Sequence, residues 1–146
     1  MDWMREIYSD LAVRYAKDEA FRGRIEGAIS REGKNISCGD EITLHVKLDG
    51  ERVSDASFEG SGCIVSQASA AMLIELIRGK SLEEVEKIIR EVEKMVRGEE
   101  FDQDLVGNLV VFSGISSIPG RSKCFTLAWK TLEEILNVIK SQTREG

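Results

Sequence analysis

The stretch ITLHVKLDGERVSDASF, residues 42–58, predicts the β-hairpin around which the rest of the fold is arranged. Apolar and polar residues alternate from Ile42 to Leu48, which is the pattern of a strand with one buried face. Asp49-Gly50 is a strong signal for a type I′ turn. The returning strand, Arg52 to Phe58, alternates imperfectly because Val53 is out of phase, so we expect a bulge.

Before the hairpin the sequence predicts one helix and then a loop. Apolar residues recur every four positions from Trp3 to Tyr15, as on the buried face of an amphipathic helix that ends near Lys17. Residues 25–29 give only a weak strand signal. The polar run from Arg31 to Asp40 predicts a loop.

After the hairpin, residues 59–63 contain two glycines and predict a turn, and helical spacing then resumes. One helix is expected from Val65 to Gly79. A second helix begins with a capping box at Ser81 and ends at Gly98. A weaker apolar segment covers residues 105–118, and a last helix carries its apolar stripe to Ile139. A helix, a small antiparallel sheet and then three or four helices define an α+β domain.

Composition narrows the class of protein. The chain has 146 residues and a formal net charge of −6, so we expect one domain over residues 1–146 and no nucleic-acid partner. No stretch is apolar enough for a membrane span, and the N-terminus lacks the order of a secretory signal, which predicts a cytoplasmic protein. The single histidine, His45, alternates with the apolar strand face and is expected to be solvated, so no catalytic triad is visible.

Three cysteines, Cys38, Cys63 and Cys124, are the candidate reactive residues. An odd number cannot form a closed set of disulfides, and the spacings of 25 and 61 residues match no short zinc motif. Each cysteine nevertheless lies at the junction of two elements, Cys38 just before a strand and the other two at a helix N-terminus, which can stabilise a thiolate. Buried packing is the competing interpretation, and it is strongest for Cys124, which lies on an apolar helix stripe.

Residues beside the cysteines suit a metal site. Gly39, Gly60 and Gly62 would let the backbone pass close to an ion, and Asp40 could add a carboxylate oxygen. Three sulfurs and one oxygen suffice for tetrahedral zinc or for a two-iron cluster. Arg121 and Lys123 could offset the negative charge of such a site. Asp40 could instead only accept backbone hydrogen bonds.

Three motifs in register resemble the U-type iron–sulfur cluster assembly proteins, a family that includes IscU, SufU and the N-terminal part of NifU. They are Cys38-Gly39-Asp40, the run from Phe58 to Cys63 with Ala68-Ser69, and the run from Pro119 to Cys124 with Leu127-Ala128-Trp129. The resemblance covers roughly residues 3 to 140. It implies a three-stranded antiparallel sheet packed by about five helices.

The resemblance also implies a site and partners. Cys38, Cys63 and Cys124 match the ligand cysteines and Asp40 the neighbouring aspartate, holding zinc or a transient 2Fe-2S cluster. Sulfur would come from a cysteine desulfurase, with Cys38 as the persulfide acceptor and Cys124 as the contender. Iron–sulfur apoproteins or a downstream assembly complex would be the recipients.

Departures from IscU favour the SufU branch and leave the mechanism open. Lys123 stands where IscU has a histidine, and residues 105–117 look like an insertion. Three hypotheses remain: a cluster scaffold, a zinc-dependent sulfurtransferase on which no cluster is built, and a metal-free interaction module with incidental cysteines. Whether the protein is an enzyme is left open.

Overall fold

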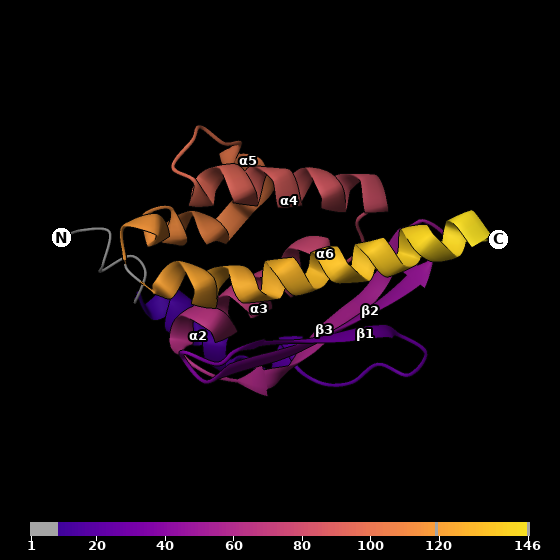
Figure 1. Ribbon diagram of the computed structural model, residues 1–146, viewed down its shortest axis with the longest axis horizontal. Helices are drawn as coiled ribbons and strands as arrows, with labels where there is room; N and C mark the ends of the chain where they lie inside the picture. Colours follow the sequence, from indigo (N-terminus) through magenta and orange to yellow (C-terminus); the bar gives the residue numbers. More distant parts are fainter. Residues whose placement is uncertain (1–8, 119, 146) are drawn as a thin grey trace.

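The computed structural model describes residues 9–118 and 120–145 (Figure 1). These residues form α2 (Asp10–Lys17), β1 (Ile29–Asn35), β2 (Asp40–Asp49), β3 (Arg52–Ser61), α3 (Ile64–Ile77), α4 (Leu82–Val96), α5 (Gln103–Val106) and α6 (Arg121–Glu145), with 3₁₀ turns η1 (Glu19–Phe21), η2 (Gly107–Phe112) and η3 (Ile115–Ser117). The α+β class is confirmed, as are the three-stranded antiparallel sheet and the five α-helices within the described part of the chain.

The sheet has the strand order β1-β2-β3, with both pairs antiparallel. The predicted bulge is confirmed, because the β2–β3 register shifts between Lys47 and Leu48. The turn differs from the prediction. Asp49 pairs with Arg52, so Gly50 and Glu51 form the loop, and of these two only Gly50 has a positive φ, of 63°. That is the pattern of a type II′ turn and not of a type I′ turn.

The predicted loop over residues 31–40 is wrong for most of its length. Residues 29–35 form β1 and pair with β2, from Ile29 opposite Val46 to Asn35 opposite Asp40. Only residues 36–39 turn the chain. The strand escaped prediction because it is an edge strand with mostly exposed polar side chains, so its sequence lacks the alternation that burial imposes. β3 likewise runs through Glu59 and Gly60 to Ser61, where a turn was expected.

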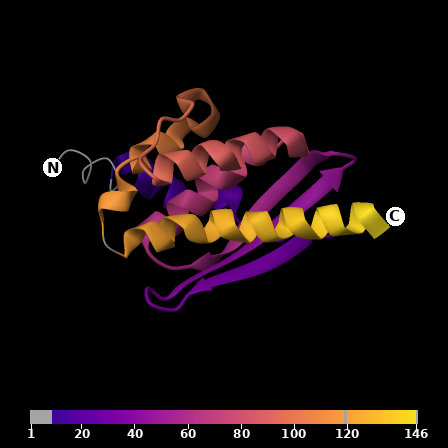
Figure 2. The same cartoon turned by 45° about the horizontal axis from the view of Figure 1, so that its top comes forward.

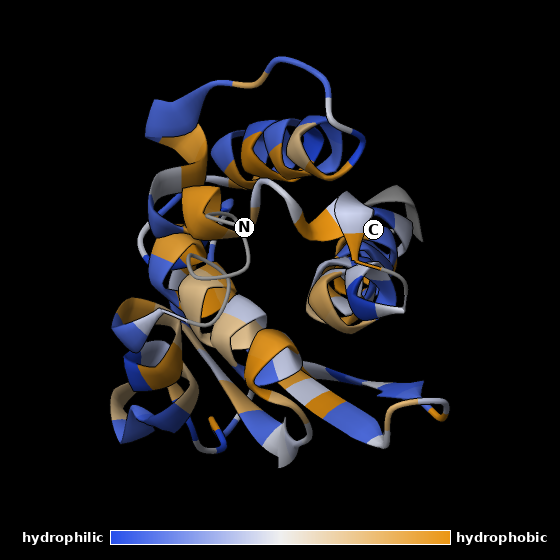
Figure 3. Cartoon of the chain, turned by 90° about the vertical axis from the view of Figure 1, so that its left-hand side faces the viewer, coloured by the Kyte–Doolittle hydropathy of each residue, from blue (hydrophilic) through white to orange (hydrophobic). Residues whose placement is uncertain are grey.

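The core lies between one face of the sheet and two helices. α6 packs on β1 and β2, and α3 packs on β3 and β2 (Figures 1 and 2). α3 is buried along almost its whole length, as expected for a central helix. α4, α5 and η2 form an outer layer, and Figure 3 shows the hydrophobic sides of the helices facing one another.

The predicted helices after the hairpin are confirmed, with α4 capped by Ser81 as its capping box indicated. The segment over residues 105–118, whose apolar pattern in the sequence is weak, is a run of short helical turns that buries Leu109, Phe112 and Ile115. Of the first predicted helix, α2 is confirmed, whereas Trp3, Met4, Ile7 and Tyr8 lie outside the described residues. None of the helices in the described ranges combines the length and apolarity needed to cross a membrane.

His45 is buried, and its predicted solvation is wrong. The side chain is on the face of the sheet opposite α3 and α6, where the segment that follows η1 packs: Ser57, the residue paired with His45, donates through Oγ to the Gly23 carbonyl at 2.7 Å. Gly23 N–H donates to the Phe58 carbonyl at 3.0 Å. Under this cover His45 Nδ1 is 2.6 Å from Ser30 Oγ, and Nε2 is 2.8 Å from Glu59 Oε1. The buried imidazole therefore links all three strands, and hydrogen bonds to both ring nitrogens offset its desolvation.

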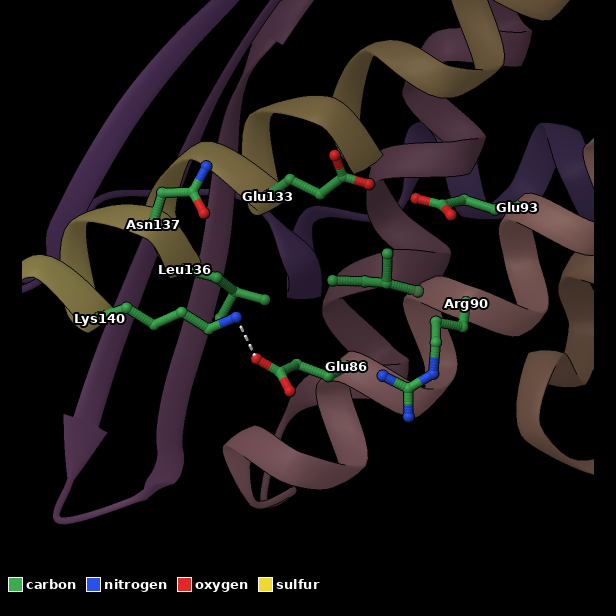
Figure 4. A pocket seen from close by; sticks show the side chains of 8 residues that line it. Glu86, Arg90, Glu93, Glu133, Leu136, Asn137 and Lys140 are labelled. Atoms are coloured by element: carbon green, nitrogen blue, oxygen red, sulfur yellow. Dashed lines mark ion pairs between the residues drawn. The ribbon is translucent and has the colours of Figure 1, made fainter.

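A groove of about 310 Å³ separates α4 from α6 (Figure 4). Lys140 Nζ and Glu86 Oε1 form an ion pair at 2.7 Å across it. Further along, Glu93 on α4 and Glu133 on α6 point toward each other. A hydrogen bond between these two carboxyls, together with burial and the Glu93 charge, raises the pKa of Glu133 to about 7, while Lys130 acts in the opposite direction.

This pair makes stability depend on pH. In the folded protein the pKa of Glu133 is about 7, whereas unfolding returns its pKa to the ordinary value of 4.5. The stabilisation is therefore fully present below the unfolded pKa and is lost as pH rises through the folded pKa. We expect Glu133→Gln to raise the melting temperature at about pH 8 and to change it little at about pH 5. Glu134→Gln, on an exposed neighbour, is the control, and an equal effect of both variants at both pH values would contradict this account.

Candidate metal centre

Four element termini meet at one end of the molecule, the left-hand end in Figure 1. Cys38 lies in the turn between β1 and β2, and Asp40 is the first residue of β2. Cys63 is the N-cap of α3, and Cys124 lies in the first turn of α6. The fold thus gathers four predicted site residues that are spread over 87 positions, from 38 to 124.

Cys38, Asp40 and Cys124 form the compact part of this cluster. One potential ligand atom from each, two Sγ atoms and one carboxylate oxygen, all lie within 4.8 Å of one another. Soft thiolates with one hard oxygen are a donor set that zinc and iron–sulfur clusters both use. The three residues are therefore placed as a metal site requires.

Cys63 adjoins this group and is engaged in another way. Its backbone N–H donates to Asp40 Oδ1 at 2.9 Å, and its Sγ accepts from the Ser66 N–H at 3.5 Å as the cap of α3. The Cys63 thiol is also among the hydrogen-bond partners of Cys124 and Asp40. Cys63 thus lies beside the cluster, and its part as a fourth ligand stays a prediction.

Asp40 is a deeply buried charged group of the site, with 1% of its surface exposed. Oδ1 accepts from the Cys63 N–H and from Ser66 Oγ at 3.1 Å, and Asn35 Nδ2 is 3.5 Å from Oδ2. Burial alone would raise the pKa of this carboxyl, but the hydrogen bonds from Cys63, Cys124 and Ser66 outweigh it and hold the pKa below its usual range. Asp40 is therefore a carboxylate at neutral pH.

The cysteines differ sharply in access to solvent. Cys38 is exposed, Cys63 is half-buried and Cys124 is fully buried. Burial, with hydrogen bonds to Asp40 and Cys38, raises the pKa of the Cys124 thiol far above its usual range. Packing of Cys124 in the core, the competing interpretation, is thus observed together with its place in the cluster. Cys38 is the thiol that a reagent or a partner protein can reach.

The three predicted glycines support the site in different ways. Gly60 and Gly62 have φ of 148° and 151°, and a Cβ added to Gly62 would lie 2.3 Å from Asp40 Oδ1. A Cβ on Gly60 would lie 2.0 Å from the Glu41 carbonyl oxygen. Gly39 has a φ of 69° but open space around it, so it serves only the turn that carries Cys38.

The predicted basic residues lie close by in sequence and in the helix. Arg121 begins α6 and is half-buried, and Lys123 is exposed in the same turn as Cys124. Their suggested role in balancing the charge of the site stays a prediction.

Sequence reasoning missed three residues that hold the site. Ser66 and Asn35 orient Asp40, and Asn35 Nδ2 also lies 3.6 Å from Cys124 Sγ. The guanidinium of Arg22 donates to the Gly60 carbonyl at 3.2 Å and to Gln67 Oε1 at 2.9 Å. Ser66 stands three residues after Cys63, in the first turn of α3, and that position was its only signal. Nothing local distinguished Asn35 or Arg22.

An α+β fold with three cysteines and an aspartate near one end is the arrangement that the resemblance to the U-type iron–sulfur cluster assembly proteins implies. The sequence model of the family described as the NifU-like N terminal domain matches residues 7–125 of this chain. The chain therefore belongs to the NifU-like N-terminal domain family, as the three motifs indicated.

Named relatives and solved structures agree with this membership. The chain is 50% identical to the iron-sulfur cluster assembly scaffold protein IscU of Thermotoga maritima, over 91% of this chain and 94% of that one. It is 37% identical to the zinc-dependent sulfurtransferase SufU of Bacillus subtilis, over 88% of each. A crystal structure of a SufU from Fervidobacterium islandicum AW-1 superposes with a TM-score of 0.83 at 45% identity, covering 88% of this chain and 96% of that one.

A matched pair of glycine variants tests how Asp40 is held. Gly39→Ala places a side chain at a positive φ in open space and is expected to cost about 1–2 kcal/mol of unfolding free energy. Gly62→Ala meets a larger backbone penalty, because its φ of 151° lies in a region almost restricted to glycine, and it also displaces Asp40 from its buried hydrogen bonds, so we expect a loss at least about twice as large. Urea unfolding of the metal-free protein measures both. Equal losses in the two variants would contradict the proposed support of Asp40 by Gly62.

Proposed function

We propose that this protein takes part in iron–sulfur cluster assembly by receiving sulfur from a cysteine desulfurase at the site formed by Cys38, Asp40, Cys63 and Cys124. The observation that carries the proposal is the gathering of Cys38, Asp40 and Cys124 within 4.8 Å at one end of the fold. The cluster-assembly scaffold of T. maritima and the sulfurtransferase of B. subtilis, both similar along most of their length, support it. Such a gathering disfavours the metal-free interaction module.

The residues present suit zinc. Cys38 and Cys124 offer thiolates, Asp40 is a buried carboxylate, and Cys63 lies beside them. Zinc prefers four ligands of this kind in a tetrahedral arrangement. A bound zinc ion would supply a Lewis acid that keeps thiols deprotonated, and would thereby oppose the burial that holds Cys124 protonated.

Cys38 is the proposed sulfur acceptor because it is the exposed thiol of the three. Its thiolate attacks the outer sulfur of a persulfide on the desulfurase. A new sulfur–sulfur bond forms on Cys38, the bond between the two donor sulfurs breaks, and the donor cysteine leaves as a thiolate. Cys124, the contender, is fully buried and would reach a partner protein only after rearrangement of the site.

A cluster scaffold is the second candidate, and the relative at 50% identity favours it. In this role a 2Fe-2S unit is cargo, built at the four groups and passed to an iron–sulfur apoprotein or an assembly complex. Asp40 would be a hard oxygen ligand among soft sulfurs and would loosen the cluster for transfer. The alternative, a zinc-dependent sulfurtransferase that passes sulfur on and builds no cluster, is favoured by two observations. They are the likeness to the B. subtilis protein and the presence of Lys123 next to Cys124.

Mass spectrometry of persulfides tests the acceptor. After anaerobic incubation with a cysteine desulfurase and L-cysteine, and alkylation, we expect one added sulfur on the peptide that contains Cys38. Cys38→Ser should abolish this product, and Cys124→Ser should retain it because Cys38 stays accessible. Sulfur found only on Cys63 or Cys124 would contradict the assignment, and a wild-type chain that acquires none would contradict the proposed function.

A further inference from the structure

The apolar side chains left in solvent are concentrated beside the reactive cysteines. Within residues 9–118 and 120–145, two large hydrophobic side chains are exposed, Ile36 at 92% and Ile64 at 36%. Isolated exposed hydrophobic residues are ordinary on protein surfaces and need no explanation. The placement of these two is not ordinary, because Ile36 precedes Cys38 by two positions and Ile64 directly follows Cys63.

Ile36 is held by a closed turn. The Cys38 N–H donates to the Asn35 carbonyl at 3.2 Å, and the Gly39 N–H donates to the Ile36 carbonyl at 3.3 Å. The Asn35 side chain fixes the start of the turn through Asp40 and Cys124. Ile36 and Cys38 are therefore presented together by one hydrogen-bonded unit. A side chain presented in this way loses little conformational freedom when it enters a pocket on a partner.

The charged side chains nearest to the turn along β1 and β2 are largely paired with each other. Lys34 Nζ lies 3.3 Å from Glu32 Oε1 and 3.8 Å from Glu41 Oε1. One cation between two carboxylates leaves a weak local field for steering a partner. Beside these paired charges, the exposed isoleucine side chain is a feature that a partner can recognise.

We propose that Ile36 is a docking anchor that enters an apolar pocket beside the sulfur-bearing group of the sulfur-donor protein and so brings Cys38 into reach. The inference rests on the proposed function, because a donor protein whose sulfur meets Cys38 must also cover a side chain two residues away. Anchors of this type, preformed and buried on binding, supply a large share of interface energy.

The test compares sulfur transfer from a protein donor with transfer from a small donor. Ile36→Ser, Ile36→Leu and Ser37→Ala are incubated at varied concentration with a cysteine desulfurase and L-cysteine, and separately with inorganic polysulfide. We expect Ile36→Ser to raise KM for the desulfurase reaction about ten- to a hundredfold, the loss expected when an isoleucine no longer leaves water for an apolar pocket. Its kcat, its reaction with polysulfide and its metal content should match the wild type. Ile36→Leu and Ser37→Ala should behave as the wild type.

Four results would overturn the inference. A KM of Ile36→Ser within about twofold of the wild type, where a tenfold loss is expected, refutes the anchor while leaving the proposed function intact. Equal losses with desulfurase and with polysulfide show damage to the site and no docking role. A wild-type dimer that Ile36→Ser converts to a monomer in sedimentation assigns the isoleucine to contact between copies of this chain. A wild-type chain without sulfur transfer from the desulfurase removes the proposed function itself and the inference with it.

Discussion

A carboxylate buried at the junction of three elements is the constraint on which this structure depends. Asp40 is almost wholly excluded from solvent, and an isolated charge in such a place would be strongly destabilising. The charge is tolerated because the N–H of Cys63 and the hydroxyl of Ser66 donate to one oxygen, and the amide of Asn35 lies near the other. These donors come from two separate parts of the chain, the first two from the start of α3 and the third from the end of β1. Burying Asp40 therefore fixes how α3 meets the sheet.

The arrangement of the cysteines follows from that junction. The N-terminus of α3 presents Cys63 against β2, and the first turn of α6 brings Cys124 under the loop that carries Cys38. Gly60 and Gly62 allow the end of β3 to lie very close to the start of β2. A methyl group on either glycine would collide with Glu41 or Asp40. One thiol is left exposed and one is buried. The candidate site accordingly combines a buried carboxylate and a buried thiol with an exposed thiol that another protein can reach.

Several features could be predicted from the sequence because their causes are local. The hairpin and its bulge follow from the alternation of Ile42 to Leu48 and the misplaced Val53, and α3 and α4 follow from helical spacing and capping. β1 could not be predicted, because an edge strand with residues such as Arg31 and Lys34 is defined by pairing with β2. The burial of His45 depends on a segment from elsewhere in the chain.

The candidate site likewise has features that local sequence could predict and features that depend on contacts between distant segments. Each cysteine could be placed at a junction from local patterns, but spacings of 25 and 61 residues did not show that they meet. Only the joint match of three motifs to a family suggested it. Asn35 and Ser66 act on Asp40 through contacts that join separate segments, so nothing near either residue in the sequence indicated its role.

The content of zinc, iron and acid-labile sulfide per chain, in protein isolated without oxygen, tests the central claim most directly. If Cys38, Asp40, Cys63 and Cys124 form one metal site for iron–sulfur assembly, the wild type holds about one zinc ion, or iron and sulfide in about equal amounts. Cys38→Ser and Cys124→Ser should each lose that content. Zinc without sulfide would favour sulfur relay, and iron with sulfide would favour the scaffold. A wild-type chain without bound metal, or metal retained in full by both variants, would contradict the account.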